Sequence, residues 1–311
     1  MKNTIKILGL IAIIMVSSLL IFATKSTAES KENKENKAII NDTNTSETYQ
    51  IRALKIPTNL NFAGERVPIE KADIKERIDR ELLVNTYWQS NGLLLFKRAH
   101  KYFPIIEPIL EKNGIPDDFK YLAVIESGLQ NVTSPAGAKG FWQIMSSTAK
   151  ENGLEVNSNV DERYHLEKAT QVACDYLNAA KERFGNWTMA AAAYNAGNAG
   201  MSRRINAQKV DSYYDLLLVS ETSRYLPRIV AVKEILSNPN KYGFIFEKED
   251  LYALEATKTI KVDTAITDIA IFSKRLGINY KILKTHNPWL RENKLNNKSR
   301  KLYEIKIPTE L

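Results

Sequence analysis

The sequence predicts a mainly α-helical protein that ends in a small α+β domain. Between residues 70 and 240, strand-like alternation is almost absent and apolar residues recur at helical spacing. From Tyr252 onward the pattern changes to an alternating stretch, two short helices and a second alternating stretch. A chain of 311 residues, 44% of them apolar, is long enough to form both parts.

The helical part begins after residues 50–68, which are expected to be extended. Residues 71–114 follow with helical periodicity, and Pro104 and Pro108 are expected to interrupt this region. Further helices are expected at residues 166–184, 188–196 and 212–236. Gly185 and Gly197 are expected to end two of them.

Glu126 is the most informative residue, because it is a lone carboxylate in an apolar stretch. A helix that enters near Pro116 places it on a buried stripe with Phe119, Leu122 and Ala123. Gly128 is expected to end this helix. Burial and the negative end of the helix dipole would both raise the pKa of Glu126, as a general acid near neutral pH requires. A structural glutamate, capped by a hydroxyl or paired with an arginine, is the open alternative.

Polar groups recur downstream inside apolar or small-residue runs, at residues 134–145, 190–197 and 221–227. The amides of Gln143 and Asn195 can donate and accept together, which suits the acetamido and hydroxyl groups of a sugar. Each could equally be a core amide that backbone groups satisfy.

Taken in order, these motifs resemble the Slt-type lytic transglycosylases, a lysozyme-like family that cleaves the glycan strands of peptidoglycan. The signature consists of Glu126-Ser127, Gly140-x-x-Gln143-Ile-Met145 and Ala193-Tyr194-Asn195-Ala196-Gly197. Gly140-Phe-Trp-Gln143 and residues 61–68 resemble the membrane-bound type D subfamily in particular. The resemblance covers roughly residues 50 to 245 and implies a lysozyme-like helical catalytic domain, expected at residues 49–245.

The resemblance also implies a mechanism with one carboxyl group. Glu126 would protonate the glycosidic oxygen between N-acetylmuramic acid and N-acetylglucosamine, then deprotonate the C6 hydroxyl to give a 1,6-anhydromuramic end. Asp161 and Glu162, the other candidates considered, are expected in a solvated loop. The implied substrate-binding residues are Ser127, Ser134, Gln143, Met145, Tyr194, Asn195 and Tyr225.

Two other functions stay open. A hydrolase of the lysozyme or chitinase kind would need a positioned water and normally a second carboxylate. A non-catalytic glycan-binding scaffold would not need Glu126 at all. Ser147-Thr-Ala-Lys150 matches the S-x-x-K of penicillin-recognising enzymes, but the K-T-G triplet is missing and Thr148 to Glu151 has the form of a capping box that opens a helix.

The N-terminus predicts export. Residues 1–28 have a positive flank and an apolar centre, as in a secretory signal peptide, and an uncleaved signal anchor is the alternative. Residues 29–48 are polar and low in complexity, which predicts a flexible linker. We therefore expect the protein in the periplasm or cell envelope; the alternative of an uncleaved anchor would hold it at the membrane through the N-terminal segment.

Residues 252–311 resemble a LysM module, a small fold that binds N-acetylglucosamine polymers. Asp263-Thr264, Ile269-Ala270 and Gly277 follow the rhythm of that family. A degenerate packing domain is the alternative.

The net charge and the few cysteines and histidines indicate which partners and cofactors to expect. Residues 1–28 contain three lysines and no acid, so the net charge of +8 falls to +5 without them, which suits loose association with an anionic wall polymer. No nucleic-acid module is present, and no oligomeric state is indicated. Cys174 is the only cysteine and the three histidines lack ligand spacing, so we expect no metal and no cofactor.

Overall fold

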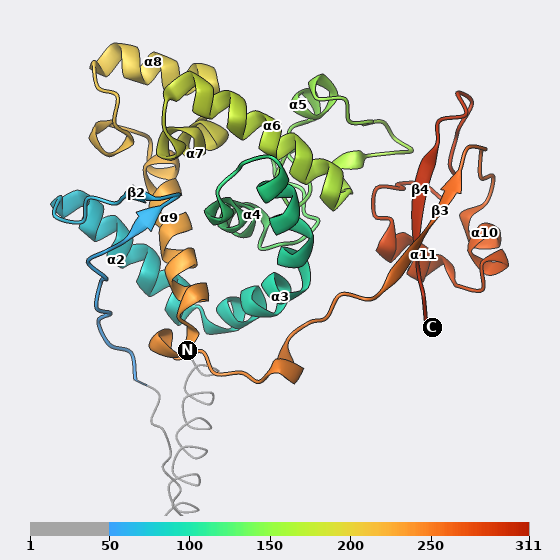
Figure 1. Ribbon diagram of the computed structural model, residues 1–311, viewed down its shortest axis with the longest axis horizontal. Helices are drawn as coiled ribbons and strands as arrows, with labels where there is room; N and C mark the ends of the chain where they lie inside the picture. The colour runs from blue at the N-terminus through green and yellow to red at the C-terminus, as the bar shows by residue number, and fades with distance from the viewer. Residues whose placement is uncertain (1–49, 311) are drawn as a thin grey trace, which may run out of the picture. The chain divides into compact units, whose positions relative to one another are not determined.

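The computed structural model describes residues 50–310. The signal segment expected at residues 1–28 and the linker expected at residues 29–48 lie outside the described residues. The mainly helical fold with a small C-terminal α+β part is confirmed (Figure 1). Within residues 50–310, no helix is both long enough and apolar enough to span a membrane.

The described chain opens with a short hairpin and two long helices. Strands β1 (Asn61–Phe62) and β2 (Glu65–Arg66) pair antiparallel, and α2 (Ala72–Tyr87) buries a stripe that includes Ile74, Ile78 and Leu82. Helix α3 (Gln89–Lys112) follows directly.

Helix α3 differs from expectation, because it runs without interruption through Pro104 and Pro108. Both prolines are exposed and lie four residues apart, on the solvent side of the helix. Ile106 and Leu110, on the opposite side, are completely buried. We infer that this burial outweighs the cost of about 3 kcal/mol for an interior proline.

Helix α4 lies near the centre of the helical part (Figure 1), and the remaining elements of this part follow. They are η1 (Asp117–Phe119), α4 (Lys120–Ser127), α5 (Ser146–Glu151), η2 (Glu162–Tyr164), α6 (Leu166–Phe184), α7 (Trp187–Ala196), α8 (Asn198–Gln208), η3 (Tyr213–Asp215), α9 (Ser220–Ser237), η4 (Pro239–Tyr242) and η5 (Lys248–Asp250). Helix α7 is rich in buried alanines and packs against α6 and α9. Gly185 ends α6 and Gly197 ends α7, as expected.

Two expectations about these helices are wrong, and one helix was not expected. Helix α9 begins at Ser220, because residues 216–219 leave the helical conformation after the short turn η3. Helix α8 had no counterpart in the sequence analysis. Helix α5 begins at Ser146, so Thr148 lies inside the helix and is not an N-cap.

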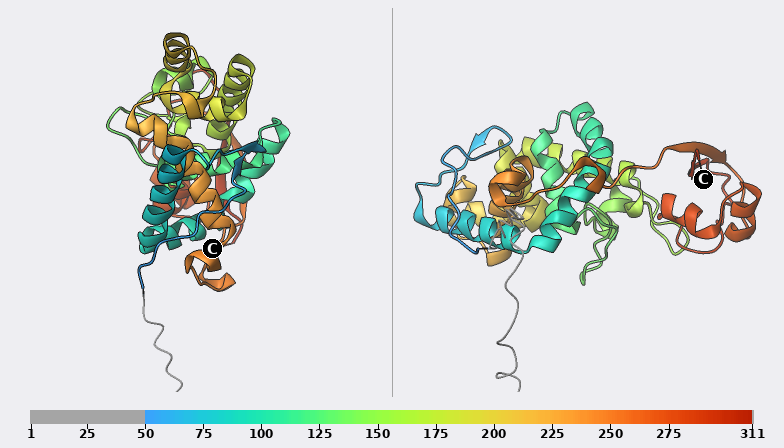
Figure 2. Two further views of the ribbon diagram at one scale, coloured as in Figure 1. Left: turned by 90° about the vertical axis from the view of Figure 1, so that its left-hand side faces the viewer. Right: turned by 90° about the horizontal axis from the view of Figure 1, so that it is seen from below.

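The C-terminal part is a two-stranded antiparallel ribbon covered by two short helices. Strands β3 (Thr257–Val262) and β4 (Tyr303–Pro308) pair in the register Lys258 with Ile307. Helices α10 (Ile269–Arg275) and α11 (Tyr280–His286) lie on the same side of the ribbon (Figure 2, right). Its hydrophobic cluster also includes Val160 and Tyr164, which belong to the helical part of the chain.

Candidate active site

Glu126 lies in the last turn of α4, where Gly128 adopts a left-handed conformation with φ of 60° and stops the helix. The preceding residues Leu122 and Ala123 are completely buried, whereas Glu126 is half-buried. The apolar stripe therefore anchors the helix and leaves its terminal carboxyl group accessible from one side.

A tyrosine from α9 holds this carboxyl group. The buried hydroxyl of Tyr225 donates a hydrogen bond to Oε1 of Glu126. Tyr194, at the end of α7, donates its hydroxyl to the carbonyl oxygen of Trp142 at 2.8 Å. Burial, and then the nearby negative charge of Glu126, raise the pKa of both tyrosines well above its ordinary value, so both remain hydrogen-bond donors.

Glu126 titrates near neutral pH. Burial raises its pKa from 4.5 to about 7, against the opposing effects of the Tyr225 hydrogen bond and the positive charge of Arg228. The negative charge of Glu221 raises the pKa further. At neutral pH, both the acid and the base form of Glu126 are therefore well populated, so this group can give a proton and take one back.

Arg228 lies beside a buried carboxylate, that of Glu81, which was not predicted from the sequence. Glu81 of α2 is only 1% exposed and accepts from Arg80 at 2.6 Å and from Arg224 at 2.7 Å. Nε of Arg228 lies 3.9 Å from Oε2 of Glu81. Glu81 sits seven residues after Ile74 on a helical stripe, which is the same signal that singled out Glu126.

Glu221 was noted only as part of a polar run. Glu221, Tyr225 and Arg228 follow the spacing i, i+4 and i+7, so they share one face of α9. From this face, the three side chains all affect the pKa of Glu126.

Asn195 connects α7 to the same face of α9. Its Oδ1 accepts from the hydroxyl of Thr222 at 2.8 Å, and its Nδ2 donates to Oε1 of Glu221 at 3.3 Å. The structure thus brings Glu126, Tyr194, Asn195 and Tyr225 into one neighbourhood by hydrogen bonds and charge.

The loop between α4 and α5 carries the other expected residues. Gln143 adopts a left-handed φ of 47° and donates through Nε2 to the carbonyl oxygens of Gly140 and Val132. Met145 is 43% exposed. Oγ of Ser134 accepts from the amide of Ala138 at 3.0 Å, which closes a turn within the loop.

Ser127 has a different environment from the expected sugar contact. Its buried hydroxyl donates to the carbonyl oxygen of Phe141 at 2.9 Å and also lies 3.1 Å from that of Ala123. The side chain therefore ties the end of α4 to the loop. Phe141 and Trp142 are buried as well, so they serve the core.

The expectation of a solvated loop at Asp161 and Glu162 is wrong. Both side chains are buried and both are ion-paired, Asp161 with Arg163 at 2.8 Å and Glu162 with Lys168. These partners hold the pKa of each carboxyl group below its ordinary value, although burial alone would raise it. Neither group is available for proton transfer.

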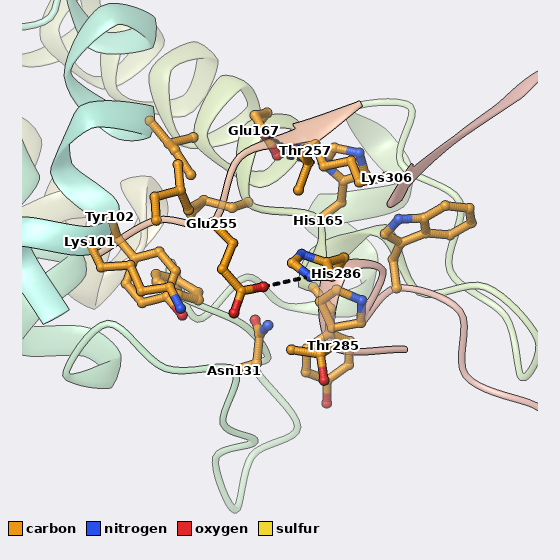
Figure 3. Close-up of a pocket in the computed structure, with 17 residues that line it drawn as sticks. Lys101, Tyr102, Asn131, His165, Glu167, Glu255, Thr257, Thr285, His286 and Lys306 are labelled. Carbon is orange, nitrogen blue, oxygen red and sulfur yellow. Dashed lines mark hydrogen bonds and ion pairs between the residues drawn. The ribbon is translucent and has the colours of Figure 1, made fainter. Parts of the chain in front are cut away.

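A separate cavity of about 260 Å³ lies where the helical and C-terminal parts meet (Figure 3). It is lined by residues of both parts, among them His165, Glu167, Glu255, His286, Trp289 and Lys306. Figure 3 shows the carboxylate of Glu255 reaching His286, at 2.9 Å between Oε2 and Nε2. Glu126 does not line this cavity. Within residues 50–310, no group of three or more histidine, cysteine or acidic side chains is arranged to hold a metal ion.

Comparison with known protein families identifies the part of the chain that contains this site. Residues 103–216 match the transglycosylase SLT domain. This part of the chain is similar to an SLT domain. Glu126, Gln143 and Asn195 lie inside the matched range, whereas Glu221 and Tyr225 follow it. Residues 258–311 match the C-terminal LysM-like domain of soluble lytic transglycosylases.

The chain is also similar to individual proteins that are named lytic transglycosylases. Membrane-bound lytic murein transglycosylase D of Escherichia coli, strain K12, is 28% identical over 235 residues, which are 73% of this chain and 50% of the relative. The protein of the same name from strain O6:H1 matches equally well. The chain thus spans about half the length of these curated relatives. A crystal structure of an inactive mutant of lytic transglycosylase Slt from Pseudomonas aeruginosa shares 18% identity and covers 49% of this chain and 26% of that one, with a TM-score of 0.36.

Proposed function

We propose that this chain is a peptidoglycan lytic transglycosylase. It would cleave the β-1,4 bond between N-acetylmuramic acid and N-acetylglucosamine and leave 1,6-anhydromuramic ends. The observation that carries the proposal is the carboxyl group of Glu126, which lies in the range similar to an SLT domain, has a pKa of about 7 and accepts a hydrogen bond from Tyr225.

The proposed reaction uses Glu126 twice. In its acid form, Glu126 would donate its proton to the glycosidic oxygen as the bond to C1 breaks. The resulting cation would be stabilised by the substrate's own acetamido group and by the new carboxylate, which Tyr225 continues to hold. The carboxylate would then take the proton of the C6 hydroxyl as its oxygen bonds to C1. Glu126 returns to the acid form and no water is consumed.

The other expected residues would bind substrate around this centre. Gln143 and Met145 would line the muramoyl subsite, and Ser134 would contact an acetamido group. Tyr194 and Asn195 would orient the sugar near the cleaved bond. For Ser127 we propose a positioning role, because its hydroxyl is buried against backbone carbonyls.

A hydrolase is the second candidate, because Glu221 supplies a second carboxylate near Glu126. Glu221 is exposed and bonded to Asn195, so it could in principle activate a water. The Glu221→Gln variant distinguishes the transglycosylase from the hydrolase. A transglycosylase would still release anhydro products after this substitution, whereas a hydrolase would lose its activity.

The remaining proposals concern location and partners. Residues 1–28 would act as a signal peptide or signal anchor, and 29–48 as a linker, which would place the enzyme in the periplasm or cell envelope. Residues 49–245 would form the lysozyme-like catalytic domain and 252–311 a LysM-like domain that contacts glycan. Peptidoglycan strands would be the partner, and the relatives named membrane-bound transglycosylases support a location at the envelope.

The deciding experiment is mass spectrometry of purified peptidoglycan digested with residues 29–311, beside the Glu126→Gln variant. Muropeptides one water lighter than the hydrolysed form, absent from the variant digest, are the expected result. Reducing-end products would establish the hydrolase instead. Absence of any product would indicate the non-catalytic glycan-binding scaffold.

A further inference from the structure

Residues 155–164 leave the helical part of the chain and are held by the C-terminal part. Asn159 makes three hydrogen bonds there: its Nδ2 donates to Lys294 O at 2.7 Å, its Oδ1 accepts from Asn296 N at 2.8 Å, and its carbonyl accepts from Arg291 N at 2.9 Å. Two residues later, the amide of Asp161 donates to Trp289 O at 2.9 Å. The C-terminal part therefore fixes the backbone of this segment.

Apolar packing reinforces the same junction. Val160 is completely buried and Tyr164 nearly so, both within the hydrophobic cluster that contains Leu290 and Ile305. The guanidinium of Arg291 lies 4.2 Å from the ring centroid of Tyr164. The C-terminal cluster is thus completed by side chains from the catalytic part.

The other end of this segment supports the loop at the candidate active site. Arg163 forms a buried, bidentate ion pair with Asp161, at 2.9 and 2.8 Å. Its free NH1 donates to the carbonyl oxygens of Gly137 and Ile144, at 3.1 and 3.2 Å. The backbone also fits closely, since a Cβ added to Gly140 would lie 2.1 Å from Arg163 O.

The supported loop, residues 137–144, bonds to residues beside Glu126. Ser127 of α4 donates to Phe141 O, and Tyr194 of α7 donates to Trp142 O. Gln143, the expected subsite residue, is held in its left-handed conformation within the same loop. An unbroken series of contacts therefore runs from the C-terminal part through Asp161 and Arg163 to the candidate site.

We propose that Asp161 and Arg163 are positioning residues through which the docked LysM-like domain sets the conformation of the 137–144 loop. The LysM-like domain then has a role in cleavage itself, in addition to any glycan binding of its own. The cleavage part of this inference rests on the proposed function, whereas the loop conformation can be measured without it.

The first test measures amide hydrogen exchange in full-length Asn159→Ala, Asp161→Asn and Arg163→Lys variants. The side chain of Asn159 bonds to the C-terminal part, so an effect of Asn159→Ala on the loop is transmitted through the residues that follow it. We expect exchange at residues 137–144 to rise about tenfold in all three variants, with exchange in α7 unchanged. Arg300→Ala is the matched control, because it breaks an exposed ion pair with Asp263 inside the C-terminal part and should change nothing in the loop.

Unchanged exchange at 137–144 in Asn159→Ala would overturn the proposal. So would a uniform rise across all helices, because that would indicate general destabilisation.

The second test follows cleavage of soluble, uncrosslinked glycan strands by the same variants. A mispositioned substrate loop should raise KM about tenfold and leave the pH dependence of kcat, set by Glu126, unchanged. Loss of kcat alone, in proportion to the unfolded fraction, would show a merely structural role. If the parent protein cleaves nothing, the proposed function fails, and the exchange result still decides this inference.

Discussion

Three neighbours act on the carboxyl group of Glu126 in opposing directions. Tyr225 and Arg228 stabilise its charged form, whereas Glu221 and the loss of hydration stabilise its neutral form. The balance, a pKa of about 7, is suited to a group that must act as an acid and then as a base. Changing any one neighbour should therefore shift the pH profile in a known direction.

Glu126→Gln tests both the chemistry and the electrostatics. We expect cleavage to fall at least about 100-fold, because the amide cannot transfer a proton.

The same variant should also change the pH dependence of stability. Since folding raises the pKa of Glu126 from 4.5 to about 7, the parent protein loses stability as pH rises through this range. The variant should consequently be more stable than the parent at pH 8, by at most about 3 kcal/mol, and equally stable at pH 4. Urea unfolding at pH 4 and pH 8 measures the difference in stability between the variant and the parent. A variant less stable than the parent at pH 8 would contradict burial as the cause of the raised pKa of Glu126.

Tyr225→Phe should shift the alkaline limb of the pH profile of cleavage to higher pH. The lost hydroxyl donates to Glu126, so its removal destabilises the carboxylate and raises the pKa by about one unit. The measurement is kcat/KM of the purified variant from pH 5 to 9. Tyr194→Phe is the control, because that hydroxyl donates to Trp142 O and its loss should not raise the limb.

At the scale of single residues, the sequence predicts the burial of a side chain when the residues that pack around it lie close along the same helix. Glu126 was identified from its own stripe, and Glu81 could have been found in the same way. The burial of Glu162 could not have been predicted, because one of its partners, Lys301, is 139 positions away. An acidic residue beside a basic one looks solvated until the segment that covers it is known.

Among the elements, helices with uninterrupted stripes were predicted well. The predicted bounds of α6 agree with the structure, and those of α7 differ by one residue. Helix α8 was missed because few of its side chains are buried, so it lacks an apolar stripe. The error in α3 has a tertiary cause, since both prolines face solvent while the opposite side packs into the core.

Two glycines of the loop before α5 offer a matched pair of substitutions. Gly137 and Gly140 have nearly equal positive φ values, of 86° and 81°, but only Gly140 lies against backbone atoms. We expect Gly137→Ala to cost about 1 kcal/mol through strain alone. Gly140→Ala should cost at least about 3 kcal/mol, because Arg163 O must move. Urea unfolding midpoints measure both; equal costs would show that the contact with Arg163 is not tight in solution.

At the scale of the whole molecule, the helical and C-terminal parts share buried contacts. Lys301 and Tyr303 both bond to Oε2 of Glu155 at 2.8 Å, and Val160 is buried in the C-terminal cluster. Separation would leave these apolar and charged groups without partners. The LysM-like part thus behaves as a fixed part of the described chain.

This shared structure predicts one cooperative unfolding transition for the full chain. Calorimetry should give a single peak whose calorimetric and van't Hoff enthalpies agree, because neither part keeps a complete core alone. Two resolved peaks would show that the parts unfold independently.

The contacts at Asn159 and Glu155 also bear on the order in which the chain folds during synthesis. They join residues separated by 135 and 146 positions, from Asn159 to Lys294 and from Glu155 to Lys301. At ordinary elongation rates, the partners emerge on the order of ten seconds after the segment they hold. Local pairs such as α6 and α7 can form earlier, so the loop beside Glu126 reaches its final conformation among the last features to fold. Under the proposed function, a nascent chain would therefore be unable to cut glycan until its C-terminal part has folded.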